Sequence, residues 1–205
     1  FDSGDLDRAV RQYFHQPTPG SGNVPGYPRI AGTPLFSRPG GVFTSTLNVT
    51  LSTTSPQGVI RFTTNGSVPS ETSTAYSGPI AISSSTLLRA RVFDTGLAPG
   101  PLVSEGYVAL AADVQNFTSD IPIVLLENFG AGGVPGNSYQ FVYMAIFEPT
   151  VDRASLRNAP DLGTRAGIKI RGSSTAGQPK PNLALETWDE KNADRDTTPL
   201  GFPSE

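Results

Sequence analysis

The sequence contains no cysteine and a single histidine, His15, among its 205 residues. The lack of cysteine excludes a disulfide framework and a thiolate nucleophile. A Ser-His-Asp triad would have to recruit His15 from near the start of the chain, so we do not expect this kind of catalysis. The missing cysteine does not by itself indicate the cytosol, because a domain with a sufficient apolar core folds without disulfides.

Charge and long apolar runs are also scarce. Charged residues make up 16% of the chain, the net charge is −3, and no run of Lys or Arg occurs. Counterion release, which drives binding to nucleic acids and anionic membranes, therefore has little to act on. No stretch approaches the roughly 18 apolar residues of a membrane helix, and the chain opens at Phe1 without a basic and apolar leader. We predict a soluble, trimmed chain that neither binds nucleic acid nor spans a membrane.

Glycine and proline, by contrast, are abundant. The chain has 22 Gly and 19 Pro, and Ser and Thr crowd residues 44–86. This balance favours short strands joined by turns over helices. We therefore predict a mainly β chain, and its length allows one large or two modest domains.

The first 33 residues contain a linker. Three prolines and three glycines lie between Pro17 and Gly26; proline lacks the amide donor and glycine raises the entropic cost of ordering, so no helix or ladder is expected there. The string at 13–23 is similar to the end of lamin-tail domains of bacterial surface proteins. Residues 1–33 are interpreted as the end of such a domain followed by a linker, with His15 as a linker side chain rather than a ligand or base.

From Leu35 onward, apolar residues alternate with polar ones. Side chains on a strand point alternately to opposite faces, so each run presents one apolar face to a core and one polar face to water. Turn signals such as Asn65-Gly66 and Ser77-Gly78-Pro79 separate the runs. Short antiparallel strands at this spacing predict a β-sandwich. The apolar positions are Leu47, Val49, Leu51, Ile60, Phe62, Leu88, Ala90 and Val92.

Residues 36–93 resemble, in order and spacing, the chitobiase/hexosaminidase C-terminal module. The most specific part is Ile-Arg-Phe-Thr-Thr-Asn-Gly-Ser-x-Pro at 60–69, followed by Tyr-Ser-Gly-Pro-Ile at 76–80. The resemblance implies an immunoglobulin-like or fibronectin III-like β-sandwich over residues 34–110. Where the family commonly has Asp-Gly in the turn, this chain has Asn65-Gly66, which keeps the turn chemistry and lacks the carboxylate.

A different pattern begins after Asn116. Two apolar runs, at 121–126 and 141–147, are joined by a Gly-rich loop. They predict a hairpin that is covered on both faces. Two further strands are predicted at 166–170 and 183–188.

Residues 118–205 resemble the beginning of the spore-coat kinase family CotH. The resemblance is carried by Asp-Ile-Pro-Ile at 120–123, Ile-Lys-Ile-Arg-Gly-Ser-Ser at 168–174, Pro-Lys at 179–180, Ala-Leu-Glu-Thr at 184–187 and Leu-Gly-Phe-Pro at 200–203. It implies a partial, β-rich (α+β) kinase-like lobe. It also implies nucleotide-side residues, since phosphoryl transfer needs amides and a cation around the phosphates. These residues are Arg171, Gly172, Ser173, Ser174 and Lys180.

Catalysis by this chain alone is not expected. The acidic metal ligands and the catalytic carboxylate of the CotH family have no counterpart here, so ATP and Mg²⁺ are cofactors of a longer parent and not of this piece. The alternative for residues 171–180 is a plain Gly/Ser hairpin with a solvated Lys. The acidic stretch from Asp189 to Asp196 is interpreted as a solvated loop rather than a metal site, because it lacks a sharp-turn Gly and a terminal bidentate Glu.

Three arginines, Arg61, Arg89 and Arg91, fall on the polar side of their predicted strands. They can bind an anionic polymer through bidentate contacts, or pair with nearby carboxylates and keep that face soluble. Aromatic residues offer a second type of polymer contact, by stacking on the apolar side of a sugar ring. The candidates, Tyr76, Tyr107 and Trp188, are equally interpreted as core or corner residues.

Three functions agree with these features. In the first, the chain is a non-catalytic region of a secreted or cell-surface bacterial multidomain protein, whose sandwich acts as a spacer or binds cell-wall or extracellular polysaccharide or another surface protein. In the second, it is the N-terminal region of a secreted CotH-like protein kinase that uses ATP and Mg²⁺. In the third, it is a subunit of an extracellular fibre or surface layer that self-assembles by pairing open edge strands. All three place it outside the cell or at its surface.

Overall fold

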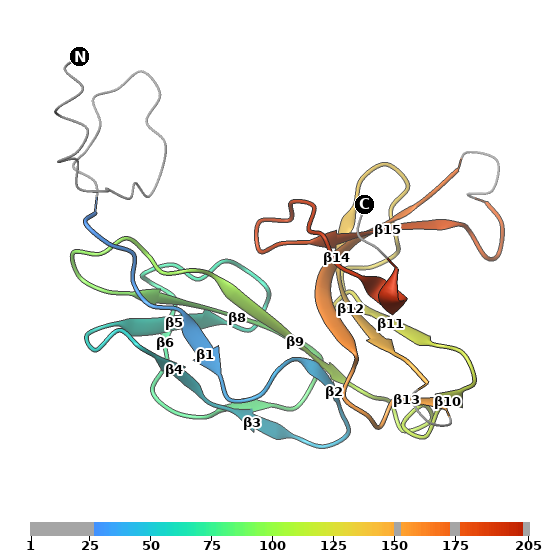
Figure 1. The fold of residues 1–205 in the computed structure, drawn as a ribbon, viewed down its shortest axis with the longest axis horizontal. Coiled ribbons are helices and arrows are strands. Elements are labelled where there is room, and N and C mark those ends of the chain that lie inside the picture. The colour runs from blue at the N-terminus through green and yellow to red at the C-terminus, as the bar shows by residue number, and fades with distance from the viewer. Residues whose placement is uncertain (1–26, 150–152, 173–176, 203–205) are drawn as a thin grey trace, which may run out of the picture. The chain divides into compact units, whose positions relative to one another are not determined.

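The computed structural model describes residues 27–149, 153–172 and 177–202. Strands dominate these residues, and helix is confined to one short 3₁₀ segment, η2 (Pro199–Gly201). Figure 1 shows this predominance of strands, which confirms the prediction of a mainly β chain. Within the described ranges, no helix is long and apolar enough to cross a membrane.

The chain divides into two compact units. The first contains the described residues up to Arg38 together with Val49–Ile80 and Arg89–Val103. The second contains Pro39–Asn48, Ala81–Leu88 and the described residues from Ser104 onward. The predicted domain boundaries at 1–33, 34–110 and 118–205 stay predictions.

The first unit is built on antiparallel pairs. Strand β5 (Val59–Thr63) pairs with β6 (Thr74–Ala75) and with β8 (Thr86–Phe93), and β1 (Pro34–Phe36) pairs with β4 (Leu51–Thr53). The alternation that predicted these strands sets their burial, because every second side chain points to the same face. The buried apolar residues of β5 and of the part of β8 in this unit are Ile60, Ala90 and Val92.

Four further strands form two more pairs. Strand β2 (Gly41–Phe43) pairs in parallel with β9 (Val103–Ala109), and β3 (Leu47–Val49) forms a two-stranded sheet with β7 (Ile80–Ile82). The strand order of the larger sheet is β2-β9-β8-β5-β6. The predicted strands around Leu47 to Leu51 and Leu88 to Val92 are thus present.

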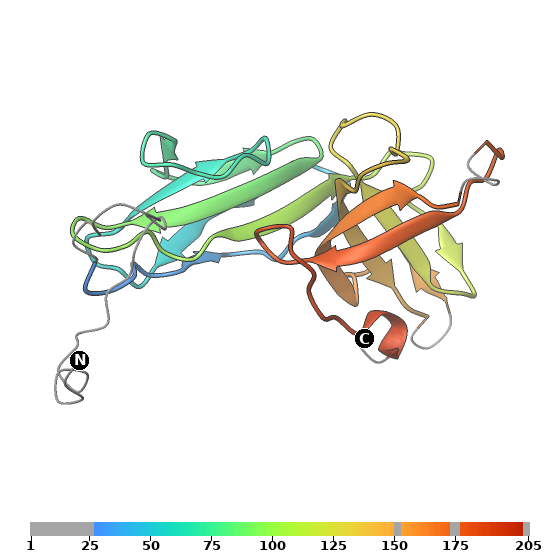
Figure 2. The ribbon, with the colours of Figure 1, turned by 90° about the horizontal axis from the view of Figure 1, so that it is seen from above.

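The second unit contains a four-stranded antiparallel sheet, seen from above in Figure 2. Its order is β11-β12-β14-β15, formed by Ile123–Glu127, Gln140–Phe147, Leu162–Ile170 and Leu183–Trp188. A small sheet pairs β10 (Thr118–Ser119) with β13 (Ala154–Ser155). The predicted hairpin and the two predicted strands that follow it are confirmed. The prediction that both runs of the hairpin are covered on both faces was wrong for the first run, because Ile121 and Val124 are 70% and 46% exposed.

Strand β12 has apolar residues on both faces, as its continuous apolar run predicted. Alternate side chains enter two separate clusters, one around Tyr143, Ala145 and Phe147 and the other around Val142, Met144 and Ile146. The first cluster also takes in Val108 and Leu110, at the end of β9. Both faces of the sheet are therefore buried along β12, which explains why the run lacks polar alternation.

Strand β14 begins at Leu162, earlier than the predicted start at residue 166. Gly163 looks unfavourable for a strand interior, since glycine there has no side chain to pack. In the structure the Tyr143 ring fills this gap, because a Cβ on Gly163 would lie 2.3 Å from the Tyr143 hydroxyl. The missing side chain is therefore a requirement of the packing.

Strand β9 also carries a half-buried carboxylate, that of Glu105. Glu105 accepts a hydrogen bond from the Gly40 backbone N–H at 2.6 Å. Burial raises the pKa of Glu105; the Gly40 bond opposes this shift and the Glu190 charge adds to it. A raised pKa means that the folded state favours the protonated form, so ionisation of Glu105 destabilises the fold.

We predict that Glu105→Gln stabilises the protein at neutral pH, because it keeps an acceptor for Gly40 and removes the buried charge. Below the unfolded pKa both forms carry a neutral side chain, and their stabilities should agree. As pH rises through the folded pKa of Glu105, the wild type loses stability and the variant does not, which gives a Tm difference of about 2 °C at pH 7. Thermal unfolding followed by circular dichroism at several pH values measures this, and a variant that is less stable at pH 7 would contradict the argument.

Candidate functional site

The three predicted polymer-binding arginines lie on one face of the β5–β8 pair. Arg61 is directly opposite Arg91, and Thr63 is opposite Arg89. Arg89 and Arg91 are two residues apart on β8, so their side chains point to the same face. The register therefore brings Arg61, Arg89 and Arg91 together.

This face is not the open, polar surface that the alternation predicted. Arg89 is 5% exposed, and its Nη1 donates to the Gly66 carbonyl at 3.1 Å. The pKa of Arg91 is lowered by burial and by the charge of Arg89. The expectation of water around all three arginines was wrong for Arg89, because a long side chain can lie along the sheet and satisfy its charged end on a turn carbonyl.

Backbone carbonyls also hold the other two arginines. Arg61 Nη1 donates to the Ser73 carbonyl at 3.0 Å, and Arg91 Nε donates to the Gly100 carbonyl at 2.7 Å. Each guanidinium group has five N–H donors, so further contacts to a ligand are compatible with these bonds. A polymer-binding role of the three arginines stays a prediction.

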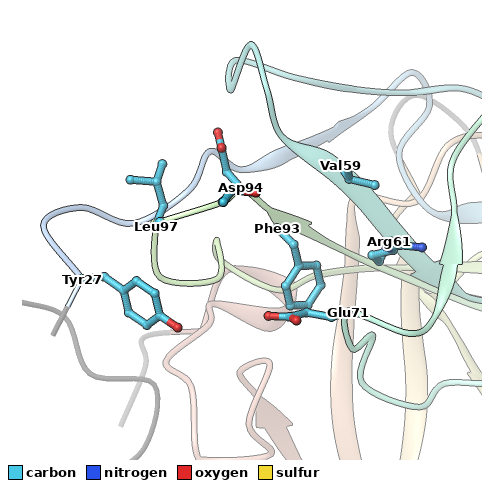
Figure 3. Close-up of a pocket in the computed structure, with 9 residues that line it drawn as sticks. Tyr27, Val59, Arg61, Glu71, Phe93, Asp94 and Leu97 are labelled. Atoms are coloured by element: carbon cyan, nitrogen blue, oxygen red, sulfur yellow. The ribbon is translucent and has the colours of Figure 1, made fainter. Parts of the chain in front are cut away.

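A pocket with a volume of about 390 Å³ lies at the end of this face (Figure 3). Val59 and Phe93, which are directly opposite each other on β5 and β8, form part of its wall. The remaining wall comes from the loop after β8 and from two separate segments. The lining residues are Tyr27, Val59, Arg61, Glu71, Phe93, Asp94, Thr95, Gly96 and Leu97.

Backbone hydrogen bonds place the segment after Tyr27 beside the loop after β8. Ala98 N–H donates to the Arg29 carbonyl at 2.9 Å, and Ala31 N–H donates to the Ala98 carbonyl at 2.8 Å. Within the loop, Leu97 N–H donates to the Asp94 carbonyl at 3.0 Å. These bonds fix two sides of the pocket relative to each other.

The pocket combines aromatic, apolar and acidic groups. Figure 3 shows the hydroxyl end of Tyr27 pointing toward the side of the pocket where Phe93 and Glu71 lie. Aromatic rings can pack against the apolar face of a sugar, while carboxylates accept hydrogen bonds from its hydroxyls. This arrangement can bind a small polar ligand that has an apolar face.

Sequence reasoning missed most of this pocket. Tyr27 lay in a segment interpreted as linker, and Asp94 lay at the start of a turn signal. Phe93 carried a usable signal, because it follows Arg89 and Arg91 at the same period of two. The contact between Tyr27 and the β8 loop is long-range and had no local signal.

The aromatic residues considered as sugar platforms lie elsewhere. Tyr107 is 1% exposed and Trp188 is 7% exposed, so both are core residues and present no open ring face. Trp188 lies against Gly167, where a Cβ would be 2.2 Å from its ring. Tyr76 is half-buried, and its backbone N–H donates to the Ile60 carbonyl at 2.9 Å.

The predicted nucleotide-side residues belong to the segment that connects β14 to β15. Arg171 and Gly172 follow β14, and Lys180 lies shortly before β15. The backbone N–H of Arg171 donates to the Asn182 carbonyl at 2.7 Å, and Gly172 has a φ of 86°. Ser173 and Ser174 fall outside the described residues. The nucleotide role of this group stays a prediction.

The acidic stretch after β15 contains a structural carboxylate rather than a uniformly solvated loop. Glu190 accepts hydrogen bonds from the Ser104 N–H at 2.8 Å and from the Ser104 hydroxyl at 2.5 Å. Its carboxylate also lies 3.9 Å from Nε of Arg165, which is buried. Glu190 thereby connects the loop after β15 to β9 within the second unit.

Comparison with known proteins gives one family. Residues 38–104 match the family model of the chitobiase/beta-hexosaminidase C-terminal domain. No curated protein and no solved structure matches the chain. The matched residues include all of the pocket lining except Tyr27. Residues 38–104 of this chain therefore form a chitobiase/beta-hexosaminidase C-terminal domain.

Proposed function

We propose that this chain is a non-catalytic, polysaccharide-binding region of a secreted or cell-surface multidomain protein. The observation that supports this function is the pocket of Tyr27, Phe93, Glu71 and Asp94 on the matched domain. It offers aromatic surface and hydrogen-bond acceptors in one place. Neither cysteine nor histidine takes part in its lining, so nucleophilic chemistry based on those residues has no basis there.

The proposal extends to the whole chain. Residues 34–110 fold as an immunoglobulin-like sandwich that presents the pocket. Residues 1–33 are the end of a lamin-tail-like region, and residues 118–205 are the start of a CotH-like domain. The first of these assignments rests on the sequence resemblance alone, and the second rests on the resemblance and on the strands found at the predicted places after Asn116.

The pocket is of a size suited to one or two sugar units rather than to a long groove. Its volume of about 390 Å³ lies near the lower end of ordinary ligand sites. Recognition of a polymer would then depend on a short portion of the chain, with affinity raised when several copies of the protein engage one polymer. Weak binding to a single oligosaccharide is therefore expected.

We predict that Phe93→Ala and Tyr27→Ala each weaken polysaccharide binding about fivefold to tenfold, because each removes an aromatic surface from the pocket. Retention on insoluble chitin, peptidoglycan and cellulose measures the effect. Phe117→Ala is the matched control, because Phe117 is an aromatic residue that is 50% exposed and does not line the pocket. Equal retention of all three variants and wild type would remove this pocket as the site, and no retention on any glycan would remove the function.

A second candidate function, self-assembly into a fibre or surface layer, is favoured by the edge strand β15. Arg195 N–H donates to the Thr187 carbonyl, on the side of β15 away from β14. Backbone groups alternate between the two sides of a strand, so those of Leu183 and Leu185 also point outward. No described residue hydrogen-bonds to them.

The open edge is short but apolar. Leu183 and Leu185 are 43% and 44% exposed, and they lie where a second strand could pair. Pro181 and the bridge between Trp188 and Asp194 limit the open part, as natural edge strands often do. Any association through this edge is therefore expected to be weak.

We predict that Leu185→Pro weakens self-association about fivefold, because proline removes an outward N–H and each lost hydrogen bond costs about 1 kcal/mol. This N–H does not pair with β14, so the sheet itself should remain. Leu185→Lys provides a second test with the backbone intact, and Val68→Lys, at a residue that is 53% exposed in the first unit, is the control. Sedimentation equilibrium over a range of concentrations measures the association, and a monomer at every concentration would contradict this second function.

A further inference from the structure

The charges around the pocket narrow the class of sugar that it can hold. Three charged side chains line it, Arg61, Glu71 and Asp94. Neither Glu71 nor Asp94 forms an ion pair with another described residue. Two carboxylates are thus available to a ligand.

Arg61, the one positively charged residue among those that line the pocket, is hydrogen-bonded to the backbone. Arg61 Nη1 donates to the Ser73 carbonyl at 3.0 Å, next to β6. Its Nε is buried and has no hydrogen-bond partner in the part of the chain that the structure describes. The guanidinium group is therefore held along the sheet by the β6 side, and it does not neutralise either carboxylate by direct contact.

The formal charge of the lining is therefore negative by one unit, from two carboxylates and one guanidinium group. An acidic sugar would meet repulsion from Glu71 and Asp94. A neutral sugar would use them as hydrogen-bond acceptors. A sugar with a protonated amine would form a charge-assisted hydrogen bond with one of them, and such bonds are stronger than neutral ones.

The two carboxylates differ in burial. Asp94 is half-buried and Glu71 is exposed. An ion pair with an exposed carboxylate contributes little because water screens it. Figure 3 shows the Glu71 carboxylate on the side of the pocket where Phe93 and Tyr27 lie, whereas the Asp94 side chain points away from both rings. Glu71 is therefore the partner for a cation bound against the aromatic surface, and the preference that it provides is small.

From these observations we infer that the pocket selects amino sugars whose amine is free and protonated, such as the glucosamine units of a deacetylated N-acetylglucosamine polymer. This inference rests on the proposed polysaccharide-binding function and specifies its ligand. The sugar ring lies against Phe93 and Tyr27, and the ammonium group lies at Glu71, with the charge of Asp94 adding to the negative charge of the lining. Arg61 also lines the pocket, with one of its guanidinium N–H groups bonded to the Ser73 carbonyl.

The test compares three tetrasaccharides with the same β-1,4 linkage: glucosamine, N-acetylglucosamine and glucose. Titration followed by ¹⁵N-¹H correlation NMR on the whole chain reports both affinity and location. We expect the glucosamine oligomer to bind at least about threefold more tightly than the other two, in keeping with a partly exposed ion pair. The preference should fall at high ionic strength and when pH is raised past the pKa of the sugar amine.

Variants assign the preference to the carboxylates. Glu71→Gln should abolish most of the preference for glucosamine, and Asp94→Asn should reduce it, while binding of the N-acetylated oligomer changes little. Asp113→Asn is the matched control, since Asp113 is exposed and lies outside the pocket. A preference that survives in the Asp94→Asn, Glu71→Gln double variant would overturn the inference.

The possible results distinguish a failure of the amino-sugar inference from a failure of the proposed polysaccharide-binding function. Equal binding of all three oligomers, with loss of binding in Phe93→Ala, would overturn the amino-sugar inference and leave polysaccharide binding intact. Tighter binding of an acidic oligosaccharide, such as a tetragalacturonate, would overturn it in the same way and favour the arginines instead. No binding of any oligomer and no retention on insoluble glycans would overturn both.

Discussion

The packing of the second unit depends on the Tyr143 side chain, which occupies the space that side chains at Gly106 and Gly163 would otherwise fill. A Cβ on Gly106 of β9 would lie 2.4 Å from the Tyr143 ring, and a Cβ on Gly163 of β14 would lie 2.3 Å from its hydroxyl. Tyr143 itself is 4% exposed. Contacts this close are excluded for any residue with a side chain, so both glycines are needed for the ring to stay where it is.

The consequences of this arrangement reach the charged groups nearby. Burial raises the pKa of Tyr143, and the carboxylate of Glu105, next to Gly106, raises it further. Beyond it, Arg165 is held by the Asp189 carbonyl, by Asn192 and by the ring of Phe141, 4.4 Å below its guanidinium carbon. Arg165 is thus buried among polar groups and an aromatic ring, with one carboxylate, that of Glu190, 3.9 Å from its Nε.

Much of the fold could be predicted from the sequence because it follows from local periodicity. Ile60, Ala90 and Val92 are buried as their alternation indicated, and the apolar run at 141–147 is covered on both sides. Local patterns could not show which distant residues fill a gap. The role of Trp188 depends on Gly167 on the next strand, and the burial of Arg89 depends on a carbonyl at Gly66. Which residues meet across two strands depends on the strand register, and the register is determined by the pattern of whole strands and not by any single residue.

The same distinction explains why the candidate site was harder to predict than its scaffold. The three arginines were recognisable because they share a strand period, and the register does bring them to one face. The pocket also needs Tyr27, and that residue is placed through backbone bonds that join Arg29 and Ala31 to Ala98. Every residue except proline has the same backbone donor and acceptor, so a contact made by backbone hydrogen bonds cannot be recognised from a sequence motif. In the proposed function, specificity depends on side chains at the end of the β5–β8 pair, and the hydrogen bonds of the three arginines to backbone carbonyls hold neighbouring segments in place.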